Sequence, residues 1–147
     1  GYEGNPEKTK EEFVNGYWKS GDIGYTDENG YCYLVDRKKD MIITGGFNVY
    51  ATEVEAAVNS HPGVLMSAVV GVPHEEWGEA VHAEVILNDS VEVAESDLIA
   101  YVKEQIGSFK TPKSVLFVEE LPLSVVGKVL RKDVRKKYWG GQVRSIG

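Results

Sequence analysis

The chain has 147 residues, of which 42% are hydrophobic, and a formal net charge of −7 at pH 7. This length suits one domain, or one domain with part of another, and this hydrophobic content is sufficient for a packed core. The negative charge argues against nucleic acid as the main partner, and no apolar run approaches the roughly 18 residues of a membrane span.

The beginning of the chain predicts a short helix and a β-hairpin. Residues 8–18 have no clean apolar period and read as a short helix with a loop. In residues 21–35, apolar and aromatic residues flank a polar turn, where Asn29 and Gly30 offer the positive φ that tight hairpin turns need. We therefore expect two antiparallel strands here.

A strand and a helix follow in close succession. The apolar residues 41–43 predict a short strand, which Gly45 and Gly46 end. A helix should begin near Thr52, because Thr52 and Glu55 have the spacing of a capping box. One face of this helix is apolar and carries Val54, Ala57 and Val58.

Two further strands are expected in the middle of the chain. Residues 64–72 predict a buried strand that stops at Pro73, and residues 75–79 predict a loop. Residues 80–87 alternate between apolar and other side chains, so this strand should be half-buried, with His82 facing outward. The expected inward residues are Val81, Ala83, Val85 and Leu87.

The last third alternates between helix and strand. Apolar residues at helical spacing predict a helix over 96–106, ended by Gly107. A strand at 114–118, a loop at 121–129 and a short basic helix from about Arg131 should follow. From residue 40 onward the pattern is that of a small α+β domain.

The chain contains no self-contained active site that these patterns reveal. His61, His74 and His82 are too far apart for a local metal site, so we expect no metal, and Cys32 reads as a small core residue. No nucleophile elbow, Walker loop or G-x-G-x-x-G pattern is present. Gly46 could allow a ligand close to the backbone and Lys128 could reach into a pocket, although a tight turn and a surface lysine are the simpler explanations.

Four stretches of the chain, in order, resemble carboxy-terminal signatures of the adenylate-forming enzymes. They are GYWKSGDIG, DRKKDMIITGGFNVYATEVE, GVPHEEWGEAVHAEVIL and LPLSVVGKVLRKDVR. This superfamily contains the acyl-CoA synthetases, luciferase and the adenylation domains of peptide synthetases. In the first stretch Ser20 stands where the family has threonine. Four blocks in order are specific, and they cover the chain from about residue 17.

The resemblance implies a fold, a division of the chain and a reaction. Residues 1–38 are similar to the end of a large amino-terminal, AMP-binding lobe, which supplies a β-hairpin. Residues 39–147 are similar to the small mobile lobe, an α+β unit with a short central sheet flanked by helices. The implied reaction forms an acyl-adenylate and pyrophosphate from a carboxylic acid and ATP, with Mg²⁺, and then transfers the acyl group to coenzyme A. The large lobe would be the partner of this fragment, which alone should be inactive.

The resemblance also implies roles for individual residues. Lys128 matches the lysine that reaches the substrate carboxylate and the α-phosphate, and is the implied catalytic residue. Asp22 matches an aspartate that binds the ribose, and Arg37 matches an arginine at the nucleotide. Lys39 matches the hinge about which the small lobe rotates. Three further positions match coenzyme A contacts: Gly46, Trp77 and Lys113.

Several alternatives remain open. MIITGGFNVYATEVE is similar to the CoA-ligase branch, which favours a fatty or aryl acid, but a peptide-synthetase-type enzyme with another acceptor is the second possibility. A non-catalytic docking or nucleotide-binding module is the third, since residues 125–147 hold seven Lys and Arg against one Asp. The cytoplasm is the expected location, because the chain has one cysteine, a polar beginning and no peroxisomal signal at its end.

Overall fold

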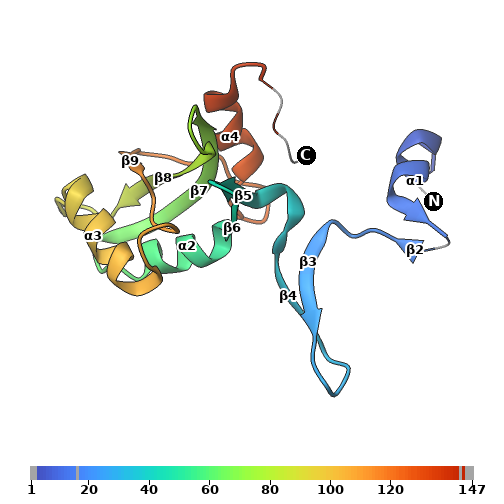
Figure 1. The fold of residues 1–147 in the computed structure, drawn as a ribbon. Coiled ribbons are helices and arrows are strands. Elements are labelled where there is room, and N and C mark those ends of the chain that lie inside the picture. The colour runs from blue at the N-terminus through green and yellow to red at the C-terminus, as the bar shows by residue number, and fades with distance from the viewer. Residues whose placement is uncertain (1–2, 16, 143, 145–147) are drawn as a thin grey trace.

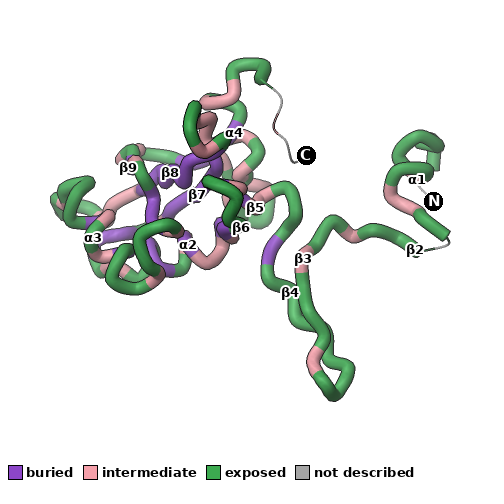
Figure 2. The backbone as a smooth tube through the Cα atoms, in the orientation of Figure 1, coloured by how far each residue is buried: buried purple, intermediate pink, exposed green. Residues whose placement is uncertain are grey.

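The computed structural model describes residues 3–15, 17–142 and 144. Figure 1 shows a body of helices and sheet, with a hairpin and a further small helical segment projecting from it. The body is the mixed α+β unit that the sequence predicts. Among the described residues, the buried hydrophobic side chains all lie between Ile42 and Val134, within this body. Figure 2 shows the same division as a purple interior beside a mostly green hairpin.

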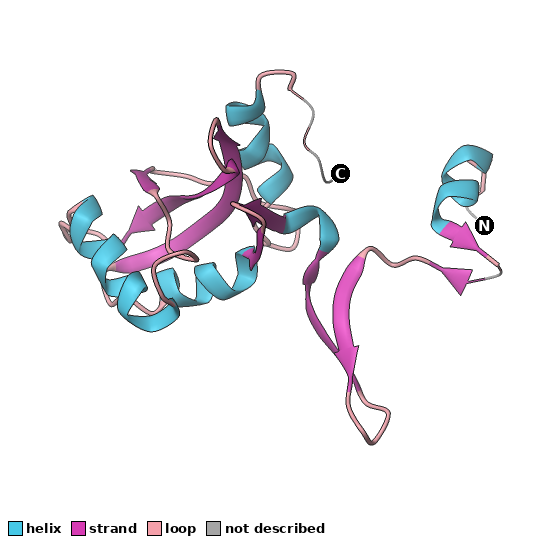
Figure 3. Ribbon diagram, viewed as in Figure 1, coloured by secondary structure: helices cyan, strands magenta, loops and turns pink. Residues whose placement is uncertain are grey.

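A five-stranded sheet forms the centre of the body, and Figure 3 shows its strands in magenta. Its members are β5 (Met41–Thr44), β6 (Phe47–Tyr50), β7 (Val64–His74), β8 (Gly78–Leu87) and β9 (Ser114–Phe117). β8 is the central strand, since it is antiparallel to β7 along its length, parallel to β9 and joined to β5 at Gly78. Strand β6 was not expected from the sequence.

Helices cover both faces of the sheet (Figure 1). α2 (Ala51–Asn59) and α3 (Glu95–Ile106) pack on one face, and α4 (Arg131–Trp139) packs on the other. The first face buries Val54, Val58, Leu98 and Val102 against Val69, Val81 and Val85. The second buries Val134 against Ala68, Val70 and Leu121. Each such side chain contributes about 1.5–3 kcal/mol of hydrophobic stabilisation.

The second helix layer overturns one prediction. β8 is not half-buried, because α4 covers the face that was expected to meet solvent. His82 is only 6% exposed and Glu84 is completely buried there. β7 also continues through Pro73 to His74, and since β7 is an edge strand of the sheet, a residue without a backbone N–H is tolerated.

The start of α2 also differs from expectation. Its N-cap is Tyr50, which makes no capping hydrogen bond, so Thr52 and Glu55 do not form a capping box. Thr52 instead bonds to Asp36, and the Glu55 carboxylate accepts from the backbone of Val69 and from Arg131. Partners distant in the sequence have replaced the local ones.

The projecting segments precede the body. α1 (Pro6–Glu12), β1 (Phe13–Val14) and β2 (Tyr17–Trp18) come first, followed by the hairpin of β3 (Asp22–Thr26) and β4 (Cys32–Arg37). The hairpin confirms the prediction for 21–35, although Gly30 alone supplies a positive φ in its turn. Cys32 is exposed, so its prediction as a core residue is wrong; no second layer covers this strand within the described part of the chain.

Candidate functional site

Two of the predicted coenzyme A contacts, Trp77 and Lys113, line one cavity of the body. Its volume is about 280 Å³, and its walls come from the β5–β6 turn, the β7–β8 turn and the loop before β9. The lining residues are Thr44, Gly45, Phe47, Trp77, Phe109 and Lys113. The fold therefore joins positions that are 36 residues apart in the sequence.

Trp77 is fixed from three directions. Its backbone N–H donates to Nδ1 of His74 at 3.2 Å, and its ring stacks on the His74 ring with 4.2 Å between centroids and 8° between planes. Its carbonyl accepts from the N–H of Gly45 at 3.0 Å, which ties the two turns together. The indole is thus held in place before any ligand arrives, which lowers the entropic cost of binding.

The other walls add aromatic surface and one positive charge. The rings of Phe47 and Phe109 lie 5.1 Å apart, and Nζ of Lys113 lies 5.7 Å from the centre of the Trp77 ring. Flat aromatic surfaces bind nucleobases by stacking, and an adjacent ammonium attracts phosphate. The residues present therefore fit a nucleotide. Sequence reasoning missed the two phenylalanines, which stand beside matched positions but carry no distinctive spacing.

Gly46 does not line this cavity; its neighbour Gly45 does. Both glycines have positive φ, 55° for Gly45 and 83° for Gly46, as a two-residue hairpin turn requires. A Cβ placed on Gly46 would meet no atom within 4 Å, so the space beside it is open in this chain. The turn alone accounts for a glycine at this position.

Asp22 and Arg37 are brought together at the base of the hairpin. They are opposite residues of β3 and β4, and Nε of Arg37 lies 3.6 Å from Oδ1 of Asp22. The Arg37 side chain is 68% exposed, so the pair contributes little stability and both groups are open to a ligand. The pair is separate from the Trp77 cavity, whose walls it does not reach.

Lys39 lies in a 3₁₀ turn (Lys38–Asp40) between the hairpin and the body. The backbone hydrogen bond before it joins the turn to the hairpin segment, and the one after it joins the turn to the body. The N–H of Lys38 donates to the carbonyl of Gly21 in the hairpin segment at 2.8 Å. The carbonyl of Lys39 accepts from Arg144 of the body at 2.8 Å. The backbone torsions of Lys38 and Lys39 therefore lie between two anchored atoms. The nitrogen of Lys38 is bound to the hairpin segment, and the carbonyl oxygen of Lys39 is bound to the body.

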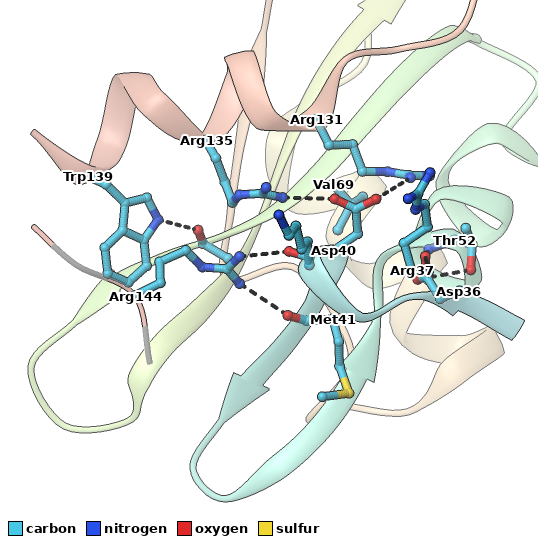
Figure 4. Close-up of polar contacts among 12 residues, drawn as sticks. Asp36, Arg37, Asp40, Met41, Thr52, Val69, Arg131, Arg135, Trp139 and Arg144 are labelled. Atoms are coloured by element: carbon cyan, nitrogen blue, oxygen red, sulfur yellow. Dashed lines mark hydrogen bonds and ion pairs between the residues drawn. The ribbon is translucent and has the colours of Figure 1, made fainter. Parts of the chain in front are cut away.

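A cluster of arginines secures the body side of this turn (Figure 4). Arg131 and Arg135 donate to the two carboxylate oxygens of Asp40 at 3.2 and 2.9 Å. Arg131 also binds Glu55 with two hydrogen bonds, of 2.7 and 2.5 Å, which raise the pKa of the guanidinium. Arg144 binds the carbonyl of Met41 in addition to that of Lys39. The sequence showed Arg131 and Arg135 only as part of a short basic helix.

Lys128 lies on an exposed loop between β9 and α4, where Leu123 and Val129 form an isolated bridge. Ser124 fixes the loop, since its Oγ accepts from the N–H of Lys128 and its own N–H donates to the Lys128 carbonyl. Lys128 is not among the residues that line the Trp77 cavity. Five of the seven predicted site residues thus form three separate groups: the Asp22–Arg37 pair, the Trp77–Lys113 cavity and the Lys128 loop. Gly46 stands next to the cavity-lining Gly45, and Lys39 lies in the turn between hairpin and body.

A buried polar chain holds α4 to the sheet. The Tyr138 hydroxyl donates to Glu84 at 2.5 Å, and Lys137 donates to the same carboxylate. Since the tyrosine hydrogen is used, Nε2–H of His82 donates to the Tyr138 oxygen and Nδ1 accepts from Ser114. Burial lowers the pKa of His82, and burial together with the bond to Glu84 raises the pKa of Tyr138.

Comparison with known proteins identifies relatives over nearly the whole chain. The family described as AMP-binding enzyme C-terminal domain matches residues 53–128. A fatty acid–[acyl-carrier-protein] ligase of Streptomyces coeruleorubidus is 41% identical over 145 residues, which are 99% of this chain and 28% of the relative. A medium/long-chain-fatty-acid–CoA ligase of Mycobacterium tuberculosis is 43% identical over 154 residues, covering 100% of this chain and 27% of that protein.

Solved structures of one relative match the fold to different extents. The ATP-bound structure of MatB from Rhodopseudomonas palustris has a TM-score of 0.86 at 43% identity, and the apo structure has a TM-score of 0.69 at 44% identity. Each comparison covers 94% of this chain and 28% of the MatB chain. The chain thus spans a little over a quarter of the length of its relatives. No helix in its described part is long and apolar enough to cross a membrane.

Proposed function

The chain belongs to the AMP-binding enzyme C-terminal domain family, and from this premise we propose that it is part of an adenylate-forming acid–thiol ligase. Residues 39–147 are the small mobile lobe, and residues 1–38 are the end of the large lobe. The large lobe is the partner that covers the hairpin, and the fragment alone is inactive. The cytoplasm remains the proposed location.

The proposed reaction has two steps that use different parts of this chain. In the first, a carboxylate oxygen attacks the α-phosphorus of ATP and pyrophosphate leaves, which gives an acyl-adenylate. In the second, the sulfur of coenzyme A attacks the acyl carbonyl and AMP leaves. Lys128 stabilises the negative charge that develops in the first step. Asp22 accepts hydrogen bonds from the ribose hydroxyls, and Arg37 lies beside the nucleotide.

The Trp77–Lys113 cavity is the single observation that carries the choice of coenzyme A. It combines a fixed indole, two further rings and one ammonium, a set that suits the nucleotide end of coenzyme A. Gly46 leaves open backbone beside this cavity for the pantetheine arm. Mg²⁺ accompanies ATP, whose phosphate oxygens are the hard ligands that this ion prefers.

Two observations support the proposed boundary and hinge at Lys39. The hydrophobic core of the described chain begins after it, at Ile42, whereas the hairpin exposes large apolar side chains that a second lobe would cover: Tyr25, Tyr31, Tyr33 and Leu34. The hydrogen bonds of Lys38 to Gly21 and of Lys39 to Arg144 anchor the two sides separately. A hinge needs free torsions between two anchored parts, and these bonds leave them at Lys38 and Lys39.

The arrangement of hairpin and body supports an adenylating state. The two MatB structures cover equal shares of this chain at nearly equal identity, yet their TM-scores are 0.86 with ATP and 0.69 without it. The difference in TM-score therefore comes from a different spatial arrangement of the same MatB chain and not from its sequence. The arrangement of this chain is more similar to that of ATP-bound MatB. We assign the arrangement in Figure 1 to the first step of the reaction.

A second candidate function replaces coenzyme A with another acceptor. One relative is named as a ligase for an acyl carrier protein, at an identity close to that of the CoA ligase. The acid is proposed as fatty or aryl, and the names of both relatives support a fatty acid. A docking module without turnover is the remaining alternative.

ATP–pyrophosphate exchange by the full-length protein, across a panel of fatty and aryl acids, tests the proposal. Acid-dependent exchange with thioester formed from added coenzyme A is the expected result. Thioester with an acyl carrier protein but not with coenzyme A would favour the second candidate. Exchange with none of the acids would contradict both and leave the docking module.

A further inference from the structure

We propose that Asp36 and Thr52 form a latch across the hinge, which holds the arrangement in Figure 1 and opens when the small lobe rotates. The inference rests on the proposed hinge at Lys39. Asp36 precedes that hinge, at the end of β4, whereas Thr52 follows it, in the first turn of α2. Rotation about Lys39 moves one residue away from the other, so bonds between them belong to one arrangement of the lobes.

Thr52 makes three hydrogen bonds across the hinge, two of which are to Asp36 (Figure 4). Its backbone N–H donates to Oδ2 of Asp36 at 3.2 Å. Its hydroxyl shares one hydrogen between the same oxygen and the carbonyl of Val35, each at 3.2 Å. Oδ1 of Asp36 accepts from the N–H of Arg37 at 2.7 Å, which fixes the carboxylate at the correct angle.

The carboxylate of Asp36 takes the place of a missing helix cap. The N-cap residue of α2, Tyr50, provides no side-chain acceptor, so the free N–H groups of the first turn need a partner from elsewhere. Asp36 supplies both an acceptor and a negative charge at the positive end of the helix. Asp36 is only 7% exposed, so the contact is largely shielded from water.

The arginine cluster on the other side of the hinge has a different role. Asp40 is bound by Arg131 and Arg135, and the Lys39 carbonyl by Arg144, all within residues 39–147. These bonds move together with the small lobe and are unchanged by its rotation. The cluster therefore fixes the turn about which the small lobe rotates. The latch, in contrast, is the contact whose presence depends on the angle of that rotation.

Opening the latch returns its polar groups to water, so the latch biases the equilibrium without blocking motion. Loss of one hydrogen bond costs about 0.5–1.5 kcal/mol, which corresponds to about 2- to 13-fold in the ratio of the two arrangements. Asp36 and Thr52 are thus positioning residues, because they act on the orientation of the lobe and not on the reacting atoms.

Distance measurement by pulsed electron paramagnetic resonance tests the latch in the full-length protein. Spin labels are attached at Glu28→Cys in the hairpin turn and Lys132→Cys on α4, both exposed positions, with Cys32→Ser and no other reactive cysteine. With Mg-ATP as the probe, the distance of the arrangement in Figure 1 should dominate in the otherwise unchanged protein. Thr52→Val should lower the ratio of this arrangement to the other by about 2- to 13-fold, and Asp36→Asn should lower it at least as much.

Two matched variants make the test specific. Thr52→Ser keeps the hydroxyl and should restore the ratio. Glu53→Gln removes an acidic charge from the same helix turn. Since Glu53 pairs with Lys110, which lies in the same lobe, this variant should leave the ratio unchanged. An unchanged ratio in Thr52→Val, an equal loss in Glu53→Gln, or a single distance in every sample would overturn the latch. If Mg-ATP has no effect on the unaltered protein, the proposed function fails, while the nucleotide-free samples still decide on the latch.

Discussion

Replacing Trp77 by alanine should weaken the binding of coenzyme A while leaving adenylation intact. Stacking of a nucleobase on an aromatic side chain is worth about 1–3 kcal/mol by alanine substitution. One face of the Trp77 ring is already covered by His74 at 4.2 Å, so at most one face is available to a ligand. The lower part of the range therefore applies, about 1–2 kcal/mol, which is about 5- to 30-fold in the dissociation constant.

Calorimetric titration of coenzyme A into the full-length protein measures this effect. Trp77→Phe keeps a stacking surface and should recover most of the affinity, which separates stacking from damage to the turn. ATP–pyrophosphate exchange on the same variants reports whether the first step is intact. An affinity for coenzyme A in Trp77→Ala within about twofold of the unaltered protein would refute the assignment of this cavity, since even weak stacking exceeds that change.

Two further predictions concern stability. Arg131→Met should destabilise the small lobe by about 3 kcal/mol, because the largely shielded Glu55 carboxylate loses its ion-pair partner and Asp40 retains Arg135 but loses Arg131. Lys132→Met on the exposed face of the same helix should change the stability little, and urea unfolding of both variants measures the difference. His82 is held neutral by burial, with its pKa below the ordinary 6.5, so the stability this provides is present above pH 6.5 and is lost as the pH falls through the folded pKa, by at most about 1.4 kcal/mol per pH unit. His82→Gln should flatten this dependence between pH 7.5 and 5.5, and a parallel pH dependence in variant and unaltered protein would contradict the assignment.

The elements with strong local patterns were predictable from the sequence. The helix over residues 95–106 follows from its apolar spacing and from Gly107, and the hairpin before residue 38 follows from its polar turn. The predictions that were wrong concern side chains whose partners are distant in the chain. Thr52 and Glu55 have the spacing of a capping box, but their side chains bind elsewhere. Thr52 donates to Asp36 and Glu55 accepts from Arg131, because hydrogen bonds to charged partners are stronger than those of a capping box.

The site was predictable in part, and for the same reason. Trp77 came from a matched block and Lys113 from its match to a coenzyme A contact outside the four blocks, yet only the fold brings them to one cavity with Phe47 and Phe109. Similarly, His82 was expected to face outward, since alternation along a strand reveals two faces but not a helix that covers the second one. Here the covering helix is α4, which lies about 50 residues further along the chain than His82.

The separation of Lys128 from the Trp77–Lys113 cavity gives the most direct test of the two-step account. In the full-length protein, Lys128→Ala is assayed for ATP–pyrophosphate exchange and, separately, for thioester formation from a supplied acyl-adenylate and coenzyme A. Loss of one group that stabilises transition-state charge costs about 100- to 1000-fold, so exchange should fall by at least about 100-fold. Thioester formation should remain close to that of the unaltered protein. Equal loss of both steps, or exchange that survives the substitution, would contradict the proposed division between the lysine loop and the cavity.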